Sequence, residues 1–286
     1  MTLPNGAPIP TGAPLTHWAP DPLVIALLVV AGIAYARSFR RVRAAGARFP
    51  TSRLVAFGTG LGVTARALLT QVDVYSDVWF SVHVEQHLLV TLAAAPLFVL
   101  GAPVTLLLLA SSSERRQRSI LPFLRGRVVA TLSRPPVAFA LFVATQYVVH
   151  LTPLYDLALR EPAVHVLEHV VFLGSGVLFW ESVVGLDPAP GRRLGYPARL
   201  LVLALAIPLE GFLALAIFSA RAPLYPAYAG LPAPWGPEAL ADQRAGAALM
   251  WLVSDAVMIG ALLLTAASWR RHEDARTRSI ERSAPS

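Results

Sequence analysis

Long apolar runs recur along the whole of this 286-residue chain, separated by stretches rich in arginine, proline or acidic residues. A helix needs about 20 mostly apolar residues to cross the hydrocarbon core of a membrane. The pattern therefore predicts an all-α polytopic transmembrane bundle of seven helices at residues 20–36, 54–72, 82–109, 135–153, 163–184, 198–220 and 243–268. The second run is the weakest, because Arg66 interrupts it and three glycines dilute its apolarity.

The arginines give the predicted bundle an orientation. They gather at 37–53, 111–134, 192–199 and 270–282, and cytoplasmic loops carry the excess of basic residues. Because 37–53 and 111–134 must then share a side, the chain between them must cross the membrane twice, which supports the second span. We expect an extracytoplasmic N-terminal segment (1–19), a seven-helix transmembrane domain (20–269) and a polar cytoplasmic tail (270–286).

Composition changes the picture in three ways. The chain is 55% hydrophobic and only 14% charged, which is typical of a protein dissolved in the lipid bilayer. It contains no cysteine, which excludes disulfides, iron–sulfur clusters and cysteine nucleophiles. The net charge of +7 comes from arginines beside the apolar runs, so it indicates membrane orientation and no nucleic-acid partner.

Five of the seven histidines lie near the predicted outer ends of three spans. His83 and His87 lie four residues apart at the start of the third span, His165 and His169 repeat that spacing in the fifth, and His150 ends the fourth. Residues four apart share a helix face. Several neutral imidazoles in a dry site favour copper or zinc over hard cations, so these histidines are candidate metal ligands. The alternative is polar packing, with the imidazoles bonded to neighbouring helices.

Further polar or soft side chains belong to the same predicted outer side, namely Asp156, Asp242, Gln243 and Met250. We expect them around or at the mouth of the site. The two aspartates are candidate partners for imidazole nitrogens, since metal-bound imidazoles usually have a carboxylate or carbonyl on the other nitrogen. Met250 lies two turns below Gln243 and offers a soft thioether, with ordinary packing as the alternative.

Three ionisable residues lie inside predicted spans: Arg66, Glu210 and Asp255. Such groups are costly in lipid and are functional candidates by default. Each carboxylate could be neutral, paired with an arginine such as Arg66, or part of an ion path. The string His165-Val166-Leu167-Glu168-His169 fits the H-x-x-E-H pattern of inverted zinc peptidases, but it is short and lies in a predicted span, so an enzyme is not expected.

Several short strings occur in a fixed order along the chain. They are residues 83–87 (HVEQH), 95–97 (APL), 100–103 (LGAP), 154–156 (LYD), the two histidines of the fifth span, 179–180 (FW), 242–246 (DQRAG) and 250–251 (MW). Over about residues 15–270, this order and spacing resemble those of the multi-pass CtaG-type cytochrome c oxidase assembly factors. In the relatives a histidine often follows the proline of the sixth span, where this chain has Pro208-Leu209-Glu210-Gly211.

The resemblance implies a bacterial plasma-membrane protein that helps to mature the copper-containing haem–copper oxidase, with oxidase subunits as partners. Our leading hypothesis is a non-enzymatic assembly factor that holds copper among the five histidines and aids its insertion. Three alternatives stay open. They are a haem b electron carrier with two axial histidines, a copper or ion transporter using the ionisable residues within the spans, and a metal-free scaffold for oxidase subunits.

Overall fold

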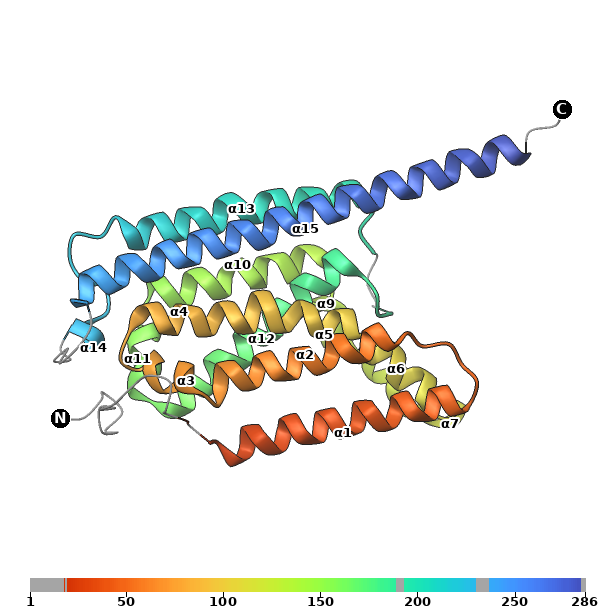
Figure 1. Cartoon of the computed structure of the whole chain (residues 1–286), viewed down its shortest axis with the longest axis horizontal. Coiled ribbons are helices and arrows are strands. Elements are labelled where there is room, and N and C mark those ends of the chain that lie inside the picture. The colour runs from red at the N-terminus through yellow and green to blue at the C-terminus, as the bar shows by residue number, and fades with distance from the viewer. Residues whose placement is uncertain (1–17, 19, 189–192, 230–236, 284–286) are drawn as a thin grey trace.

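The computed structural model describes residues 18, 20–188, 193–229 and 237–283, and every regular element in these ranges is a helix (Figure 1). This confirms the all-α class. The predicted N-terminal segment 1–19 lies almost entirely outside the described residues. The first half contains α1 (Pro22–Ala44), α2 (Thr51–Leu68), α3 (Gln71–Ser76), α4 (Phe80–Leu88), the π-helical turn η2 (Leu89–Ala94), α5 (Ala95–Gly101) and α6 (Pro103–Ala110).

The second half begins with a series of short helices: α7 (Ser113–Arg115), η3 (Arg116–Ile120), α8 (Leu121–Leu124) and α9 (Arg127–Leu132). The remaining helices are α10 (Pro135–Leu151), α11 (Leu154–Arg160), α12 (Pro162–Val184), α13 (Tyr196–Phe218), α14 (Pro226–Ala229) and α15 (Ala239–Ser283). The predicted tail therefore continues the last helix as far as Ser283, beyond the end of the bundle (Figure 1).

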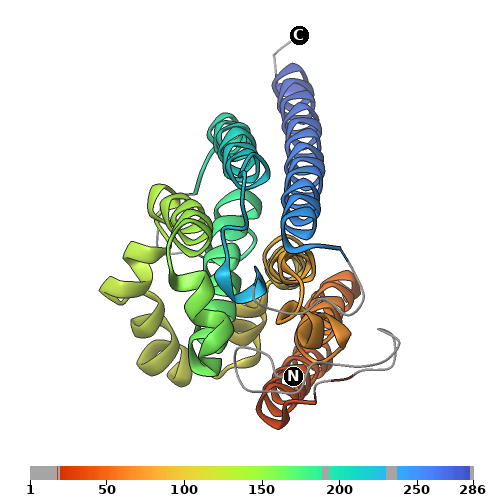
Figure 2. The same cartoon turned by 90° about the vertical axis from the view of Figure 1, so that its left-hand side faces the viewer.

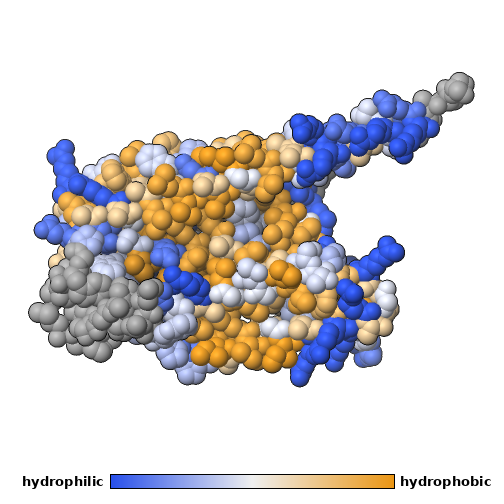
Figure 3. All heavy atoms as spheres, in the orientation of Figure 1, coloured by the Kyte–Doolittle hydropathy of each residue, from blue (hydrophilic) through white to orange (hydrophobic). Residues whose placement is uncertain are grey.

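Among the described residues, five helical segments are long and apolar enough to cross a membrane: Pro22–Ala44, Phe80–Ala110, Pro162–Val184, Tyr196–Phe218 and Ala239–Ser279. A sixth is formed by α10 and α11 if these two helices, bent by 72°, make one span. An apolar band covers the middle of the molecule, with hydrophilic residues towards its ends (Figure 3). The protein is thus a multi-pass membrane protein. In place of the weak second span stands the 18-residue α2, and seven spans with their orientation stay a prediction.

The helix that carries the first histidine pair lies inside the bundle. In the end-on view of Figure 2, α4 is surrounded by other helices, and it contacts α3 and α15 while its continuation η2 contacts α2 and α12. Close packing on α12 occurs at Gly176, where an added Cβ would lie 3.1 Å from Thr91 Cγ2. The Trp180 indole donates to the Thr91 carbonyl at 2.9 Å. These contacts hold η2, the continuation of α4, against α12.

Candidate metal centre

All five predicted histidines converge at the end of the bundle that carries α14. His83 and His87 come from α4, His150 from α10, and His165 and His169 from α12. Ring centroids are 4.5 Å apart for His83–His87, 5.1 Å for His83–His165 and 4.4 Å for His165–His169. The His87 ring lies 5.8 Å from His150 and 6.3 Å from His169. Three helices distant in sequence therefore bring their imidazoles into one cluster.

A carboxylate from α12 joins this cluster. Glu168 is only 6% exposed, and its oxygens lie 3.4 Å from His83 Nε2 and 3.7 Å from His87 Nε2. The two Nε2 atoms are 3.0 Å apart. Two ligand atoms each ~2.0 Å from one ion at a tetrahedral angle lie ~3.3 Å apart. The spacing of these three side chains is therefore that of ligands to a shared cation.

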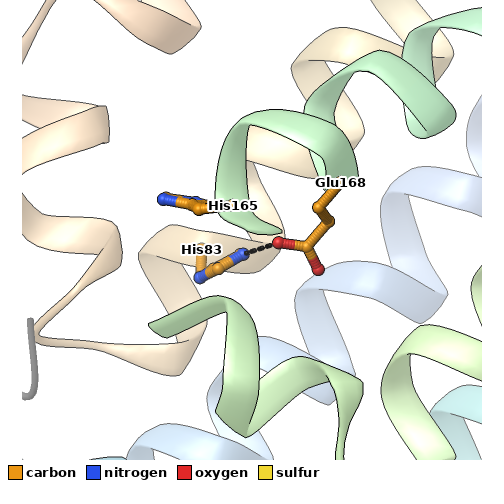
Figure 4. Close-up of side chains that lie close together, drawn as sticks. All are labelled: His83, His165 and Glu168. Atoms are coloured by element: carbon orange, nitrogen blue, oxygen red, sulfur yellow. Dashed lines mark ion pairs between the residues drawn. The ribbon is translucent and has the colours of Figure 1, made fainter. Parts of the chain in front are cut away.

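A second grouping uses the same carboxylate. His83, His165 and Glu168 each offer one ligand atom, and these atoms lie within 4.8 Å of one another (Figure 4). From the sequence, Glu168 was recognised only as part of a peptidase-like string and was not predicted as a candidate ligand. Its position three residues after His165 was the available signal, because residues three apart on a helix share a face.

Several donor atoms of the cluster lack partners. Among the described residues, both Glu168 oxygens and the Nε2 atoms of His150, His165 and His169 are buried without a hydrogen bond. Burying a charged or polar group without a partner is costly, so buried charges are normally paired or coordinate metals. Neutral imidazoles with one carboxylate are a donor set that suits copper or zinc. The residues present therefore fit a transition-metal cation.

Hydrogen bonds set the tautomers of two histidines. His150 Nδ1 lies 2.8 Å from the Gln146 carbonyl, which can only accept, so Nδ1 carries the hydrogen. His83 Nδ1 lies 3.1 Å from the hydroxyl of Tyr228, whose own hydrogen is donated to the Ser76 carbonyl at 2.6 Å. In both rings Nε2 then keeps its lone pair. Such fixed tautomers are what metal ligation requires.

Aromatic side chains cover the cluster. Tyr155 is fully buried, and its hydroxyl lies 3.5 Å from that of Tyr228. The ring of Tyr225 stacks on Phe80 at 4.8 Å and lies 4.3 Å from Tyr155. Burial raises the pKa of the Tyr228 phenol well above its usual range, so it remains a neutral hydrogen-bond donor. The sequence contained no signal for this tyrosine, because the four-residue α14 that carries it is too short to produce a hydropathy pattern.

The two aspartates predicted beside the histidines hold neighbouring elements instead. Asp156 accepts from the Ala227 amide at 2.7 Å and from Arg160 at 2.8 Å, which anchors α14 over the cluster. Asp242 accepts from the backbone amide and hydroxyl of Ser81, at the start of α4. Neither hydrogen-bonds to a histidine among the described residues. The two aspartates therefore act on the site indirectly, because they hold α14 and the start of α4 in position.

Gln243 and Met250 make no hydrogen bond to the histidine cluster in the described part of the chain. Gln243 accepts from the Leu224 amide at 2.7 Å and donates to the Ile217 carbonyl at 3.1 Å. It thereby ties the start of α15 to the end of α13. Met250 is 2% exposed and belongs to the hydrophobic core, as the packing alternative expects.

In the described part of the chain, Arg66 pairs with neither of the two carboxylates predicted within the spans. Arg66 lies 3.4 Å from Glu85, so Arg66 is not the partner of Glu210 or Asp255. Glu210 is 2% exposed, and one of its oxygens accepts from the Gln146 amide at 3.5 Å. Asp255 accepts from the Trp251 indole at 2.9 Å, so neither carboxylate is paired with an arginine among the described residues.

Comparisons with known proteins agree with this picture. A family model described as cytochrome c oxidase caa3 assembly factor (Caa3_CtaG) matches residues 33–272. Uncharacterized proteins of Mycobacterium bovis and Mycobacterium tuberculosis are each 34% identical over 274 residues, which is 93% of this chain and 41% of each relative. One from Mycobacterium leprae is 34% identical over 265 residues, 90% of this chain and 40% of the relative.

The chain thus spans about two fifths of the length of these relatives. No solved structure matches it. The family match covers most of the chain, including every residue of the histidine cluster. The chain therefore belongs to the cytochrome c oxidase caa3 assembly factor family.

Proposed function

We propose that this protein is a non-enzymatic assembly factor that holds a copper ion as cargo in the histidine cluster and passes it to subunits of cytochrome c oxidase. The family supports the biological process. One observation carries the metal: the Glu168 carboxylate is buried without a hydrogen bond, 3.4–3.7 Å from the Nε2 atoms of His83 and His87. A bound cation would supply the missing positive charge.

Copper is the proposed cargo for two reasons. The donor set of imidazoles and one carboxylate suits copper and zinc better than hard cations. Between these two metals, an assembly factor for a copper-containing oxidase favours copper. Removal of the cover formed by Tyr155 and Tyr228, or its movement by a partner, would then expose the ion for transfer.

The proposed orientation places the cluster towards the outside. The arginine-rich connections at 37–53 and 111–134 lie at the opposite end of the bundle from α14 (Figure 1), and such connections belong in the cytoplasm. This orientation requires α2 to cross the membrane as a seventh span. Copper arriving from outside would then meet the cluster close to the surface.

Cysteine labelling tests the topology, because the natural chain contains no cysteine. In intact cells, Thr152→Cys should react with a membrane-impermeant maleimide, whereas Ser52→Cys and Ser113→Cys should react only after lysis. If Ser52→Cys and Ser113→Cys were labelled from opposite sides, α2 would not cross, and the seven-span proposal would be wrong.

Metal retention tests the cargo. The purified full chain is loaded with Cu(I) under reducing conditions in detergent, desalted and assayed for copper by mass spectrometry. The variant with all five clustered histidines changed to alanine should lose the copper, as should His83→Ala alone. His272→Ala, on the exposed end of α15, is the matched control and should retain it.

Size-exclusion profiles and helical circular dichroism establish that each variant is folded before its copper is compared. Equal copper in the wild type and in the folded His83→Ala and five-histidine variants would overturn the proposal. A visible spectrum with haem bands in the membrane-extracted protein would replace it by the haem b carrier.

A further inference from the structure

A cavity of about 350 Å³ lies beside the histidine cluster, between α1, the α3 region and α12. One part of its wall carries the carboxylates of Asp21, Asp73 and Asp77, and another carries His165 and His169. Most of the remaining lining is apolar. The carboxylates come from the start of α1 and from around α3, at the same end of the bundle as α14 (Figure 1).

The imidazoles in this wall have free donor atoms. His165 Nε2 and His169 Nε2 are both buried and make no hydrogen bond to any described residue. The His165 ring lies 5.1 Å from the ring of His83, and His165, His83 and Glu168 bring ligand atoms within 4.8 Å of one another. His165 therefore belongs both to the cavity wall and to the group that it forms with His83 and Glu168.

Asp73 is held in place from the inner side. Gln86 directly precedes His87 in α4 and is fully buried. Its amide donates to Asp73 Oδ1 at 2.8 Å and to the Ala67 carbonyl at 3.0 Å. Burial raises the pKa of Asp73 to about 7; Asp77 and Asp21 raise it further, while the Gln86 hydrogen bond and His83 oppose them. Asp73 is thus a carboxylate held in position in the wall of the cavity.

We propose that this cavity is the entrance through which a copper ion reaches the group of His83, His165 and Glu168, with Asp73, His165 and His169 as transfer ligands. The inference rests on the proposed function, because it supplies the path for the same cargo. A group of carboxylates raises the local concentration of cations. Imidazoles suit copper, so His165 and His169 can then take the ion from the carboxylates.

A competing path is less suitable. A groove of about 290 Å³ between α10, α11 and α12 also reaches Glu168. Its lining is otherwise almost entirely apolar, with residues such as Leu141, Val148 and Leu167. An ion entering there would lose its hydration waters before meeting a ligand, and the desolvation of an ion without compensation is prohibitive. The carboxylate-lined cavity offers ligands from the first contact.

Two adjacent residues of α12 separate the two paths experimentally. Val166 lines the cavity and Leu167 lines the apolar groove, and their exposed fractions are similar, 53% and 59%. Each is changed to tryptophan in the full chain, so that each variant fills one of the two openings. The two variants are matched because both add the same side chain to α12. The rate of Cu(I) loading of the purified apo proteins is measured by rapid mixing, and their final copper content by mass spectrometry.

Val166→Trp and Asp73→Asn should each slow loading, the latter by about tenfold as expected when a steering charge is removed. The final copper content should equal that of the wild type in both. Leu167→Trp should load at the wild-type rate. High salt should shrink the Asp73→Asn effect, because ions screen the attraction of the carboxylate, but leave the Val166→Trp effect unchanged.

The entrance would be wrong if Val166→Trp loaded at the wild-type rate, or if Leu167→Trp were the slow variant. That failure is distinct from a failure of the proposed function. If only the entrance is wrong, the proteins still fill with copper, but at rates that contradict the path. If the proposed function is wrong, the wild type retains no copper at equilibrium.

Discussion

Glu168→Gln keeps the shape of a buried side chain and removes the only carboxylate within the histidine cluster among the described residues. A pair of unit charges ~4 Å apart interacts by about 4 kcal/mol at an effective dielectric constant of ~20. Because ~1.4 kcal/mol corresponds to a tenfold change in affinity, the loss amounts to about three orders of magnitude in Kd. We therefore expect copper affinity to fall by that factor.

The same substitution should stabilise the metal-free protein. Both Glu168 oxygens are buried without a hydrogen bond, and an unsatisfied buried polar group costs about 1–3 kcal/mol, more when it is charged. Glutamine removes the charge, so the melting temperature of the apo protein should rise while copper affinity falls. Competition with a chromophoric Cu(I) chelator measures the affinity, and circular dichroism in the same detergent measures unfolding.

Glu210→Gln is the matched control. Glu210 is also buried, with one oxygen lacking a partner, but it lies on α13 outside the cluster. Its substitution should leave copper affinity unchanged. The reasoning would be refuted if Glu168→Gln bound copper as tightly as the wild type. A lower melting temperature of apo Glu168→Gln would also refute it, since Glu168 would then stabilise the fold as the partner of a protonated imidazole.

Three further predictions concern the surroundings of the cluster. Burial raises the pKa of Asp73 to about 7. The wild type should therefore load copper much faster than Asp73→Asn at pH 8, where the carboxylate is charged, and the ratio of the two rates should shrink towards pH 6. A rate ratio that does not change with pH would contradict this. An added Cβ at Gly246 would lie 2.5 Å from the Phe80 ring, so Gly246→Ala should destabilise the protein by about 1–3 kcal/mol in thermal unfolding, and wild-type stability would show that the ring can move. Asp242→Ala removes the acceptor for the Ser81 amide at the start of α4 and should cost about 1 kcal/mol, as for a lost helix cap, whereas Asp242→Asn should retain most of it.

Much of the fold could be predicted because the bilayer imposes a minimum length on every span. The predicted span 163–184 corresponds to α12 (Pro162–Val184), and 135–153 to α10 (Pro135–Leu151). The 72° bend between α10 and α11 was missed. Hydropathy measures how apolar a run is and carries no information on its direction. The helical continuation of α15 to Ser283 was likewise hidden, because polar residues form exposed helices as readily as loops.

The candidate site shows the same division. Helical spacing alone places His83 with His87 and His165 with His169, because residues four apart share a face. The sequence by itself thus determined the membrane class and the histidine pairs. Only the tertiary structure decided which helices face one another, and so brought Glu168 to the Nε2 atoms of α4 and Tyr228 to His83. Those contacts depend on side-chain packing between helices distant in the chain, which no local spacing encodes.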